Sequence, residues 1–289
     1  MIPPSFEYLR PKTIPEAIAL LQQYGDEAKI LSGGQSLIPM MKLRLARPAY
    51  LVDLNRIPGL SYIKEEGDFL KIGGLTREAE LEASPLIHSK YPIILDTAHV
   101  IADPQVRNLA TVAGNLAHGD PANDHPATML ALGAQLVASG PRGERVIPIA
   151  DFFLSVFSTA LQPGEILTEI RIPVPPARSG GAYFKLERKV GDFATAAVAA
   201  QLTVDDQGTA QKVGIGLTNV GPTPIKARKA EDFLRGKKVD TGNIGQAAQL
   251  AAGESQPSAD LRGPAEYKKG LVGELARRAL SRALERAAH

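Results

Sequence analysis

The sequence of 289 residues contains no cysteine and no tryptophan, and aromatic residues make up only 5% of it. A chain without cysteine forms no disulfide bond and supplies no thiolate ligand to an iron–sulfur cluster. Long hydrophobic runs are also missing, because the small apolar stretch from Phe193 to Ala200 is far shorter than the ~20 residues of a membrane-spanning helix. The first residues lack the basic stretch and apolar run of a signal peptide. We therefore expect a cytoplasmic protein with no transmembrane segment.

Neither sign of charge dominates the chain. It has 33 Lys and Arg against 31 Asp and Glu, which gives a formal net charge of +2. This balance favours neither nucleic acid nor membrane surfaces as partners. With 44% hydrophobic and 22% charged residues the composition is that of an ordinary globular protein, and the length allows two or three domains.

Several common functional motifs are absent as well. The dinucleotide fingerprint G-x-G-x-x-G and the phosphate-binding pattern that ends in Gly-Lys-Ser/Thr do not occur. There is no G-x-S-x-G elbow, and none of the five histidines has an obvious serine partner. Nucleophilic hydrolysis therefore has weak support, and a dinucleotide would need a different binding mode.

Two stretches rich in small and polar residues stand out instead. The central stretch from Asp103 to Ala127 has no long apolar segment, so we expect loops there rather than core. The turn Ser32–Ser36 follows a predicted strand end at Leu31. Small residues let a ligand approach the backbone, and exposed N–H groups suit an anionic, hydroxyl-rich ligand such as a dinucleotide. Because neither Ser32–Ser36 nor the small-residue turn at Ala113 and Gly114 contains Lys or Arg, the phosphates would be held mainly by backbone N–H groups.

The hydrophobic pattern predicts a mixed fold with three parts. The first 55 residues or so follow a β-α-β pattern, with a capping box at Thr13–Glu16 before the helix. Strands and helices then alternate up to a proline- and glycine-rich linker at 173–181. Three strand candidates follow, which suggests a small antiparallel sheet, and helices complete the chain. The strand candidates span 182–186, 194–204 and 213–219, and the helices span 226–234, 241–252 and 265 to the end.

The polar residues around position 120 allow more than one interpretation. Suitable metal-ligand side chains are present, but their spacing matches no standard metal site, and Pro121 and Pro126 suggest loop shaping. These side chains are His118, Asp120, Asp124 and His125. Asp124 could also cap the helix that follows it. We expect no metal.

Alternation along a strand would place Tyr183, Lys185 and Glu187 on one face. One interpretation is a solvated edge of the sheet, where lysines are common. The other places Lys185 near electron-rich ring atoms of a cofactor, with Phe193 either covering such a ring or lying in the core.

With both turns in view, the chain resembles the FAD-binding medium subunit of the molybdenum hydroxylases, the family of aerobic carbon monoxide dehydrogenase and xanthine dehydrogenase. The resemblance covers nearly the whole length. Its motifs are ILSGGQSLIPMMK at 30–42, RNLATVAGNL at 107–116, PAND at 121–124, FK at 184–185 with Arg188, and EYKK at 266–269.

The resemblance implies an α+β protein with a vanillyl-alcohol-oxidase-type (PCMH-type) FAD-binding fold of two subdomains, 1–57 and 58–177. A C-terminal domain, 178–289, would hold a three-stranded antiparallel sheet and helices. It further implies that FAD contacts residues in both turns, that Asp124 binds a cofactor hydroxyl, and that Ile101, Leu161 and Lys185 approach the flavin. The implied cofactor-binding residues are Ile30, Leu31, Ser32, Gly33, Gly34, Gln35, Ser36, Leu37, Ile101, Thr111, Ala113, Gly114, Asn115, Asp124, Leu161 and Lys185, with no catalytic residue.

Two positions depart from the family pattern. Ala113 replaces the first of two glycines that often precede the asparagine, and it would cost about 1 kcal/mol or more if that position needs a positive φ. The carbon monoxide dehydrogenase branch commonly has histidine where Gln35 stands. Neither change removes a necessary charge, so FAD binding is still expected.

The implied function is electron transfer inside a larger oxidoreductase. A large partner subunit would carry the molybdenum cofactor, a small partner would carry [2Fe-2S] clusters, and FAD on this chain would pass electrons to an external acceptor. A dimer of heterotrimers is the implied assembly. The alternatives are a stand-alone flavoenzyme of the same superfamily and a non-enzymatic nucleotide-binding module.

Overall fold

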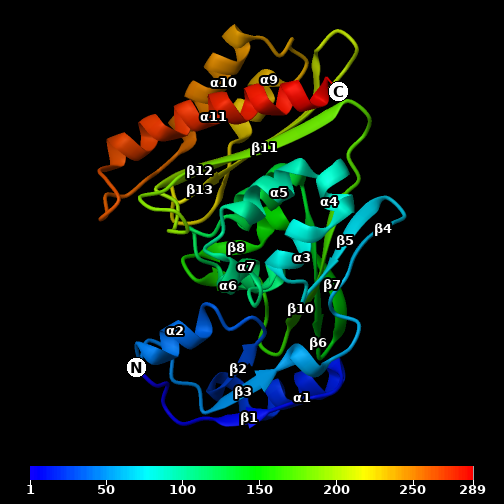
Figure 1. Ribbon diagram of the computed structural model, residues 1–289, viewed down its shortest axis with the longest axis vertical. Helices are drawn as coiled ribbons and strands as arrows, with labels where there is room; N and C mark the ends of the chain where they lie inside the picture. The colour runs from blue at the N-terminus through cyan, green and yellow to red at the C-terminus, as the bar shows by residue number, and fades with distance from the viewer. Residues whose placement is uncertain (289) are drawn as a thin grey trace.

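The computed structural model describes residues 1–288, whose N-terminal part folds around a small parallel sheet (Figure 1). The strand order is β1-β3-β2, and both pairings are parallel. This confirms the expected β-α-β pattern and adds β1. The elements are β1 (Glu7–Leu9), α1 (Ile14–Tyr24), η1 (Gly25–Glu27), β2 (Ala28–Leu31), α2 (Leu37–Lys42), β3 (Tyr50–Asp53) and η2 (Leu54–Arg56). Thr13 caps α1 as its spacing predicted, accepting a hydrogen bond from the Glu16 N–H.

The middle of the chain forms a five-stranded antiparallel sheet in the order β4-β5-β10-β6-β7. Its strands are β4 (Ile63–Glu66), β5 (Phe69–Gly73), β6 (Gln135–Gly140), β7 (Gly143–Pro148) and β10 (Ile166–Pro173). Its helices are α3 (Glu78–Ala83), α4 (Pro85–Lys90), α5 (Pro92–His99), α6 (Pro104–Arg107), α7 (Val112–His118), α8 (His125–Leu132) and η3 (Ile149–Asp151). A short hairpin, β8 (Phe153–Ser155) and β9 (Ser158–Thr159), follows η3.

The expectation that the central stretch forms loops rather than core is wrong in part. The stretch contains α6 and α7 and the start of α8, and Val112 and Leu116 are fully buried. Helices this short show too little apolar periodicity to be recognised, because four to eight residues cover only one or two turns.

The C-terminal part forms an antiparallel sheet in the order β11-β12-β13-β14, covered by three helices. The prediction of three strands is corrected to four, because β14 has two residues and is too short to show alternation. The elements are β11 (Ser179–Leu186), β12 (Ala196–Val204), β13 (Ala210–Thr218), β14 (Ile225–Lys226), α9 (Arg228–Leu234), α10 (Thr241–Glu254) and α11 (Ala265–Ala287). The alternation of helices and strands with antiparallel sheets confirms the mixed fold class.

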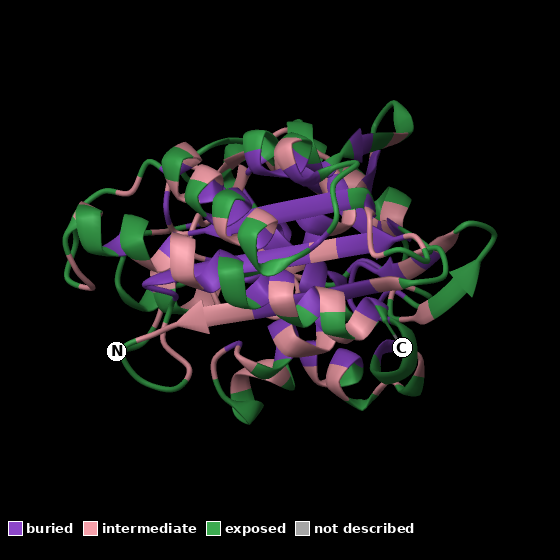
Figure 2. Ribbon diagram, turned by 90° about the horizontal axis from the view of Figure 1, so that it is seen from above, coloured by how far each residue is buried: buried purple, intermediate pink, exposed green. Residues whose placement is uncertain are grey.

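Each of the three larger sheets has a hydrophobic cluster beside it, and Figure 2 shows buried residues concentrated along the central strands. Helix α8 joins the middle to the C-terminal sheet through two glycines of β13. A Cβ at Gly214 would lie 1.9 Å from the Ala131 carbonyl oxygen, and one at Gly216 would lie 2.0 Å from that of Ala127. This close packing fixes α8 against the C-terminal sheet.

No helix within residues 1–288 combines the length and apolar character needed to cross a membrane.

Candidate functional site

The two turns meet in space although they are far apart in the sequence. The Ser32 Oγ lies 3.3 Å from the Thr111 Oγ1, across 79 residues of chain. A Cβ on Gly33 would lie 2.4 Å from the Leu109 carbonyl oxygen, so only a glycine allows this approach of the two backbones. The structure therefore brings the predicted residues of both turns into one site.

The first turn presents a run of free backbone donors. Within the part of the chain that the structure describes, no acceptor takes the N–H groups of Gly33, Gly34, Gln35 or Ser36. Gly34 has a φ of +72°, in the region that glycine adopts at little cost. Successive N–H groups around such a residue make a concave site for an anion.

The second turn is the beginning of α7. The Thr111 hydroxyl accepts a hydrogen bond from the Gly114 N–H at 3.1 Å and so caps the helix. A Cβ on Gly114 would lie 2.6 Å from that hydroxyl oxygen and 3.2 Å from the Ser32 Oγ. Both turns are thus held close by small residues.

Ala113 sits in the first turn of α7 and is not among the non-glycine residues with positive φ. The cost that a positive φ would impose on alanine at this position therefore does not arise.

We predict that Ala113→Gly leaves FAD affinity unchanged and lowers the free energy of unfolding by about 0.5–1 kcal/mol, because glycine is less favourable than alanine in a helix. Chemical denaturation and FAD titration of the variant and wild type measure both values. Tighter FAD binding by the variant would contradict the conclusion that Ala113 has an unstrained helical conformation.

Asn115 supplies an acceptor that lacks a partner. Its side-chain Oδ1 is buried, and no hydrogen-bond donor reaches it within residues 1–288. Its backbone carbonyl accepts a hydrogen bond from the Asn123 Nδ2 at 2.7 Å, which links the second turn to the segment before α8. An orphaned buried acceptor is costly unless a ligand or water satisfies it. A hydroxyl- and amide-bearing cofactor fits this position.

A second cluster forms around Lys185, whose side chain is 1% exposed. Its ammonium donates to the Val100 carbonyl at 2.9 Å and lies 3.1 Å from Asp124 Oδ2 and 3.2 Å from Glu187 Oε2. The interpretation of a solvated lysine is therefore wrong. Although β11 is an edge strand, α5 packs against it and the Asp96 side chain accepts from the Tyr183 N–H at 3.2 Å.

Asp124 precedes α8 but makes no capping hydrogen bond, so the capping interpretation is also wrong. Its Oδ1 accepts from the Tyr183 hydroxyl at 2.6 Å, and its Oδ2 faces Lys185. Burial raises the pKa of Asp124, and the Lys185 charge and the Tyr183 hydroxyl oppose that rise. The pKa of Tyr183 lies well above its usual value because burial and the neighbouring carboxylate both disfavour the phenolate. Tyr183 therefore stays protonated and acts as a donor.

Of the other predicted residues, Ile101 lies beside this cluster and Leu161 packs elsewhere against the core. Ile101 follows the carbonyl that Lys185 binds and is 7% exposed. Leu161 lies beyond β9 and packs against the core of the middle sheet. Phe193 is 46% exposed, with the Arg262 guanidinium 5.8 Å from its ring centroid, so it is not a core residue.

The residues of the metal interpretation are divided among different environments. His125 and Glu78 form a fully buried pair at 2.7 Å, and the His118 ring packs on that of Phe157. Burial lowers the pKa of His118. Within residues 1–288, no group of three or more His, Cys, Asp or Glu side chains is arranged to hold a metal ion.

Sequence reasoning gave no role to three residues of the site: Tyr183, Asn55 and Arg77. The alternation along β11 placed Tyr183 beside Lys185 but did not show that both reach Asp124. Asn55 donates to the Ser32 carbonyl at 2.9 Å, and Arg77 donates to the Leu109 carbonyl. Neither contact has any local pattern in the sequence that could reveal it.

Comparison with known proteins matches the sequence to two adjacent family models. Residues 4–175 match the FAD binding domain in molybdopterin dehydrogenase, and residues 181–283 match the CO dehydrogenase flavoprotein C-terminal domain. This chain is an FAD-binding medium subunit of the molybdenum hydroxylase family. The expected family is confirmed, and with it the flavoprotein part of an oxidoreductase complex.

Individual relatives match this medium subunit over its full length. The carbon monoxide dehydrogenase medium chain of Afipia carboxidovorans is 48% identical, with 99% of each chain covered. The corresponding chain of Hydrogenophaga pseudoflava is 45% identical over 100% of each chain. The crystal structure of the Cu,Mo-CO dehydrogenase in its cyanide-inactivated form contains a chain with a TM-score of 0.96 and 48% identity, covering 99% of this chain and 100% of that one.

Proposed function

We propose that this medium subunit holds FAD against its two turns and the Lys185 cluster, accepts electrons from a [2Fe-2S] subunit and passes them to an external acceptor. The observation that carries the proposal is the run of four N–H groups at Gly33–Ser36 that have no acceptor within residues 1–288, set against the start of α7. An FAD diphosphate is the kind of anion that such donors bind.

The proposal gives each part of the site a role. The first turn and the start of α7 bind the diphosphate, Asn115 and Asp124 bind polar groups of the cofactor, and Ile101, Leu161 and Lys185 face the flavin. The residues assigned to FAD are Ile30, Leu31, Ser32, Gly33, Gly34, Gln35, Ser36, Leu37, Ile101, Thr111, Ala113, Gly114, Asn115, Asp124, Leu161 and Lys185.

When bound, FAD supplies the ability to take up electrons singly and to release them in pairs. The protein binds and orients it and sets its potential. A buried ammonium at Lys185 would stabilise negative charge on the reduced flavin by Coulomb attraction.

We also propose that the chain has the domain boundaries 1–57, 58–177 and 178–289, with the first two forming a PCMH-type FAD-binding unit. The change between family models near residue 180 supports the last boundary, and the presence of a hydrophobic cluster beside each of the three larger sheets supports a division into three parts, although the clusters share residues across the boundaries.

Partner subunits are proposed to be a large molybdenum subunit and a small [2Fe-2S] subunit, in a cytoplasmic dimer of heterotrimers. A reducing compartment keeps the thiolate ligands of such a cluster available.

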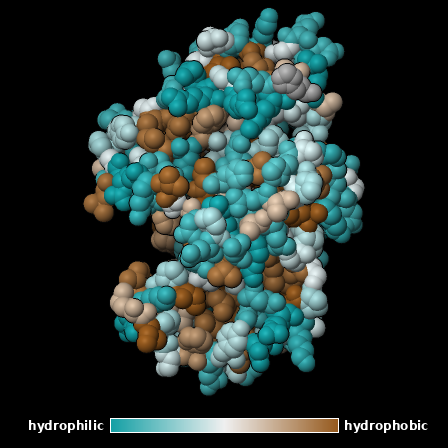
Figure 3. All heavy atoms as spheres, viewed as in Figure 1, coloured by the Kyte–Doolittle hydropathy of each residue, from teal (hydrophilic) through white to brown (hydrophobic). Residues whose placement is uncertain are grey.

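The N-terminal part offers apolar surface for contacts with partner subunits. Ile2, Leu43 and Leu45 are exposed there, and the Arg44 guanidinium donates to the Ile2 carbonyl at 2.7 Å. Figure 3 shows hydrophobic atoms gathered over this part of the molecule.

The molybdenum subunit would select the substrate of the complex. Since the medium chains that are 48% and 45% identical belong to carbon monoxide dehydrogenases, carbon monoxide is the first substrate to test once a large subunit is present.

The visible spectrum of the purified chain, followed by acid release and chromatography of the chromophore, tests the proposal. We expect FAD near one per chain, with little substrate oxidation until the partner subunits are added. A chain that stays colourless with added FAD, both alone and with its partners, would refute the proposed function. Substrate turnover by the chain alone would instead support the stand-alone flavoenzyme.

A further inference from the structure

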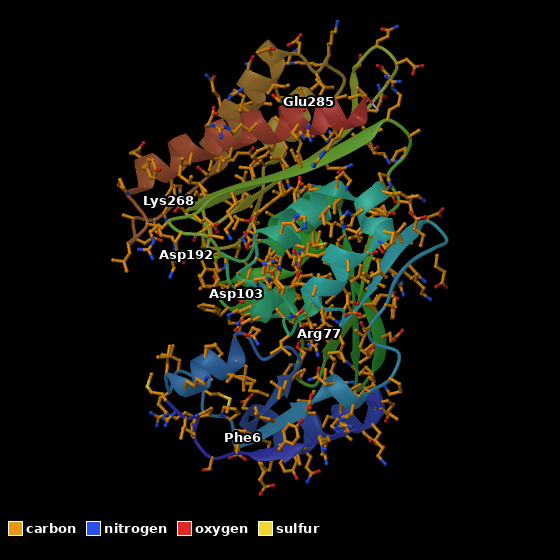
Figure 4. The ribbon with its side chains drawn as sticks, in the orientation of Figure 1. Phe6, Arg77, Asp103, Asp192, Lys268 and Glu285 are labelled. Carbon is orange, nitrogen blue, oxygen red and sulfur yellow. The ribbon has the colours of Figure 1, made fainter. Side chains whose placement is uncertain are left out.

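One basic side chain binds residues that lie next to the two turns, although neither Ser32–Ser36 nor the start of α7 contains a basic residue. Arg77 precedes α3, and Figure 4 shows it where the N-terminal part meets the middle of the molecule. One terminal nitrogen of its guanidinium donates to the Leu109 carbonyl, and the other donates to the Asn55 Oδ1. Its backbone N–H donates to Glu80 Oε2 at 2.7 Å, which fixes the start of the side chain.

The two acceptors of Arg77 belong to residues that lie against the first turn. The Leu109 carbonyl is the group that faces Gly33, where a Cβ would lie 2.4 Å away. Asn55 links the guanidinium to the first turn, because its Nδ2 donates to the Ser32 carbonyl at 2.9 Å. The guanidinium therefore connects the first turn, through Asn55, to the segment that leads into α7.

The charge of Arg77 has no close counter-charge. No carboxylate within residues 1–288 lies within 4.0 Å of its guanidinium, although Glu80 and Asp53 are near enough to favour its charged form. The residue is half-buried, and burial lowers the pKa of Arg77. An arginine nevertheless remains cationic at neutral pH. The site thus contains a positive charge that Asn55 connects to the first turn, whose four N–H groups have no acceptor within residues 1–288, and this arrangement favours a phosphate-bearing ligand.

We propose that Arg77 is a cofactor-positioning residue, which fixes the spacing of the two turns through its forked hydrogen bonds and supplies the positive charge beside the FAD diphosphate. This inference rests on the proposed function. The two features together require arginine, because a lysine ammonium could supply the charge but could not hold two acceptors in the fixed geometry of the guanidinium.

Titration of FAD into the full-length apo-protein at low and high salt tests the proposal, using wild type, Arg77→Lys and Arg77→Met. If wild type takes up FAD only with its partner subunits, the complex is used for all three. We expect Arg77→Met to weaken FAD binding about tenfold to a hundredfold, as loss of a charge-assisted contact would. Its affinity should depend less on salt than that of wild type, because a charge near the phosphates is missing. Arg77→Lys should lie between the two.

Arg171→Met is the matched control. Arg171 is a half-buried residue of β10 in the same middle sheet, and its Nε donates to Glu169 Oε1 at 2.5 Å, with no contact to either turn. We expect wild-type FAD affinity in this variant. The melting temperature of each apo-variant separates a loss of fold from a loss of binding.

The outcomes distinguish a failure of the proposed FAD function from a failure of the role proposed for Arg77. Wild type that binds no FAD in any form would refute the proposed function. Wild type that binds FAD with the same affinity and salt dependence as Arg77→Met would refute the inference alone. Equal affinity of Arg77→Lys and wild type would remove the positioning role, and equal affinity of Arg77→Lys and Arg77→Met would remove the charge role.

Discussion

Replacing Gly33 by valine is expected to abolish FAD binding. A Cβ at this position would lie 2.4 Å from the Leu109 carbonyl oxygen and 2.8 Å from the Ala110 Cα, both of which belong to the backbone. The two turns would have to separate, and the free N–H groups of the first turn would no longer face the start of α7. Overpacking of this kind also lowers the free energy of unfolding by about 1–3 kcal/mol. FAD retained after gel filtration and chemical denaturation of the apo-protein measure the two effects.

The matched control is Gly245→Ala, in the middle of α10. Nothing lies within 4 Å of a Cβ built there. Alanine is favoured over glycine inside a helix, so this variant should keep wild-type FAD and gain about 0.5–1 kcal/mol of stability. Gly33→Ala gives a milder test, because its Cβ meets the same backbone atoms but it lacks the two further methyl groups of valine. Near-stoichiometric FAD in Gly33→Val would show that the cofactor does not occupy the space between the turns.

Much of the site could be located from local sequence, because the turns are built from small residues that follow recognisable strands or precede helices. The turn after β2 was predicted from Ser32–Ser36, and the capping box of α1 from Thr13 and Glu16. The start of α3 is harder to place from local sequence, because Thr76 is of a residue type that caps helices, yet the residue before that helix is Arg77 and the Thr76 hydroxyl donates to the Tyr62 carbonyl at 3.0 Å. A threonine near a helix end has both hydrogen-bonding alternatives available, so its residue type alone does not decide where the helix begins.

What the sequence could not predict is which distant groups meet. The contact between Ser32 and Thr111 depends on how the parallel and antiparallel sheets pack, and no periodicity records that packing. The burial of Lys185 has the same cause. Alternation along β11 predicted its face correctly, but α5 decides that this face is covered rather than solvated. Asp124 could serve as a cap or as an ion-pair partner, and the position of β11 selects the second.

Replacing Lys185 by methionine is expected to change both the flavin and the fold. The buried carboxylates of Asp124 and Glu187 would lose the cation that lies 3.1 and 3.2 Å from them. Breaking a buried ion pair in this way costs about 3–5 kcal/mol of stability. The reduction potential of the bound flavin should fall, by roughly 30 mV for each ~1.4 kcal/mol of attraction lost to a two-electron reduced form. Spectroelectrochemical titration with saturating FAD measures the potential, and denaturation measures the stability.

Two further variants separate the effects of Lys185 on stability and on potential. Lys185→Arg keeps the charge, so its flavin potential should remain close to that of wild type whatever its stability. In Lys185→Met combined with Asp124→Asn, the unpaired Asp124 carboxylate is gone although that of Glu187 remains, and the amide oxygen still accepts from the Tyr183 hydroxyl, so part of the lost stability should return. An unchanged potential in Lys185→Met would leave Lys185 as a purely structural residue. A fall in Lys185→Met that is absent from Lys185→Arg would instead assign the potential to the charge itself, because the two variants share the loss of the native ammonium and differ in charge.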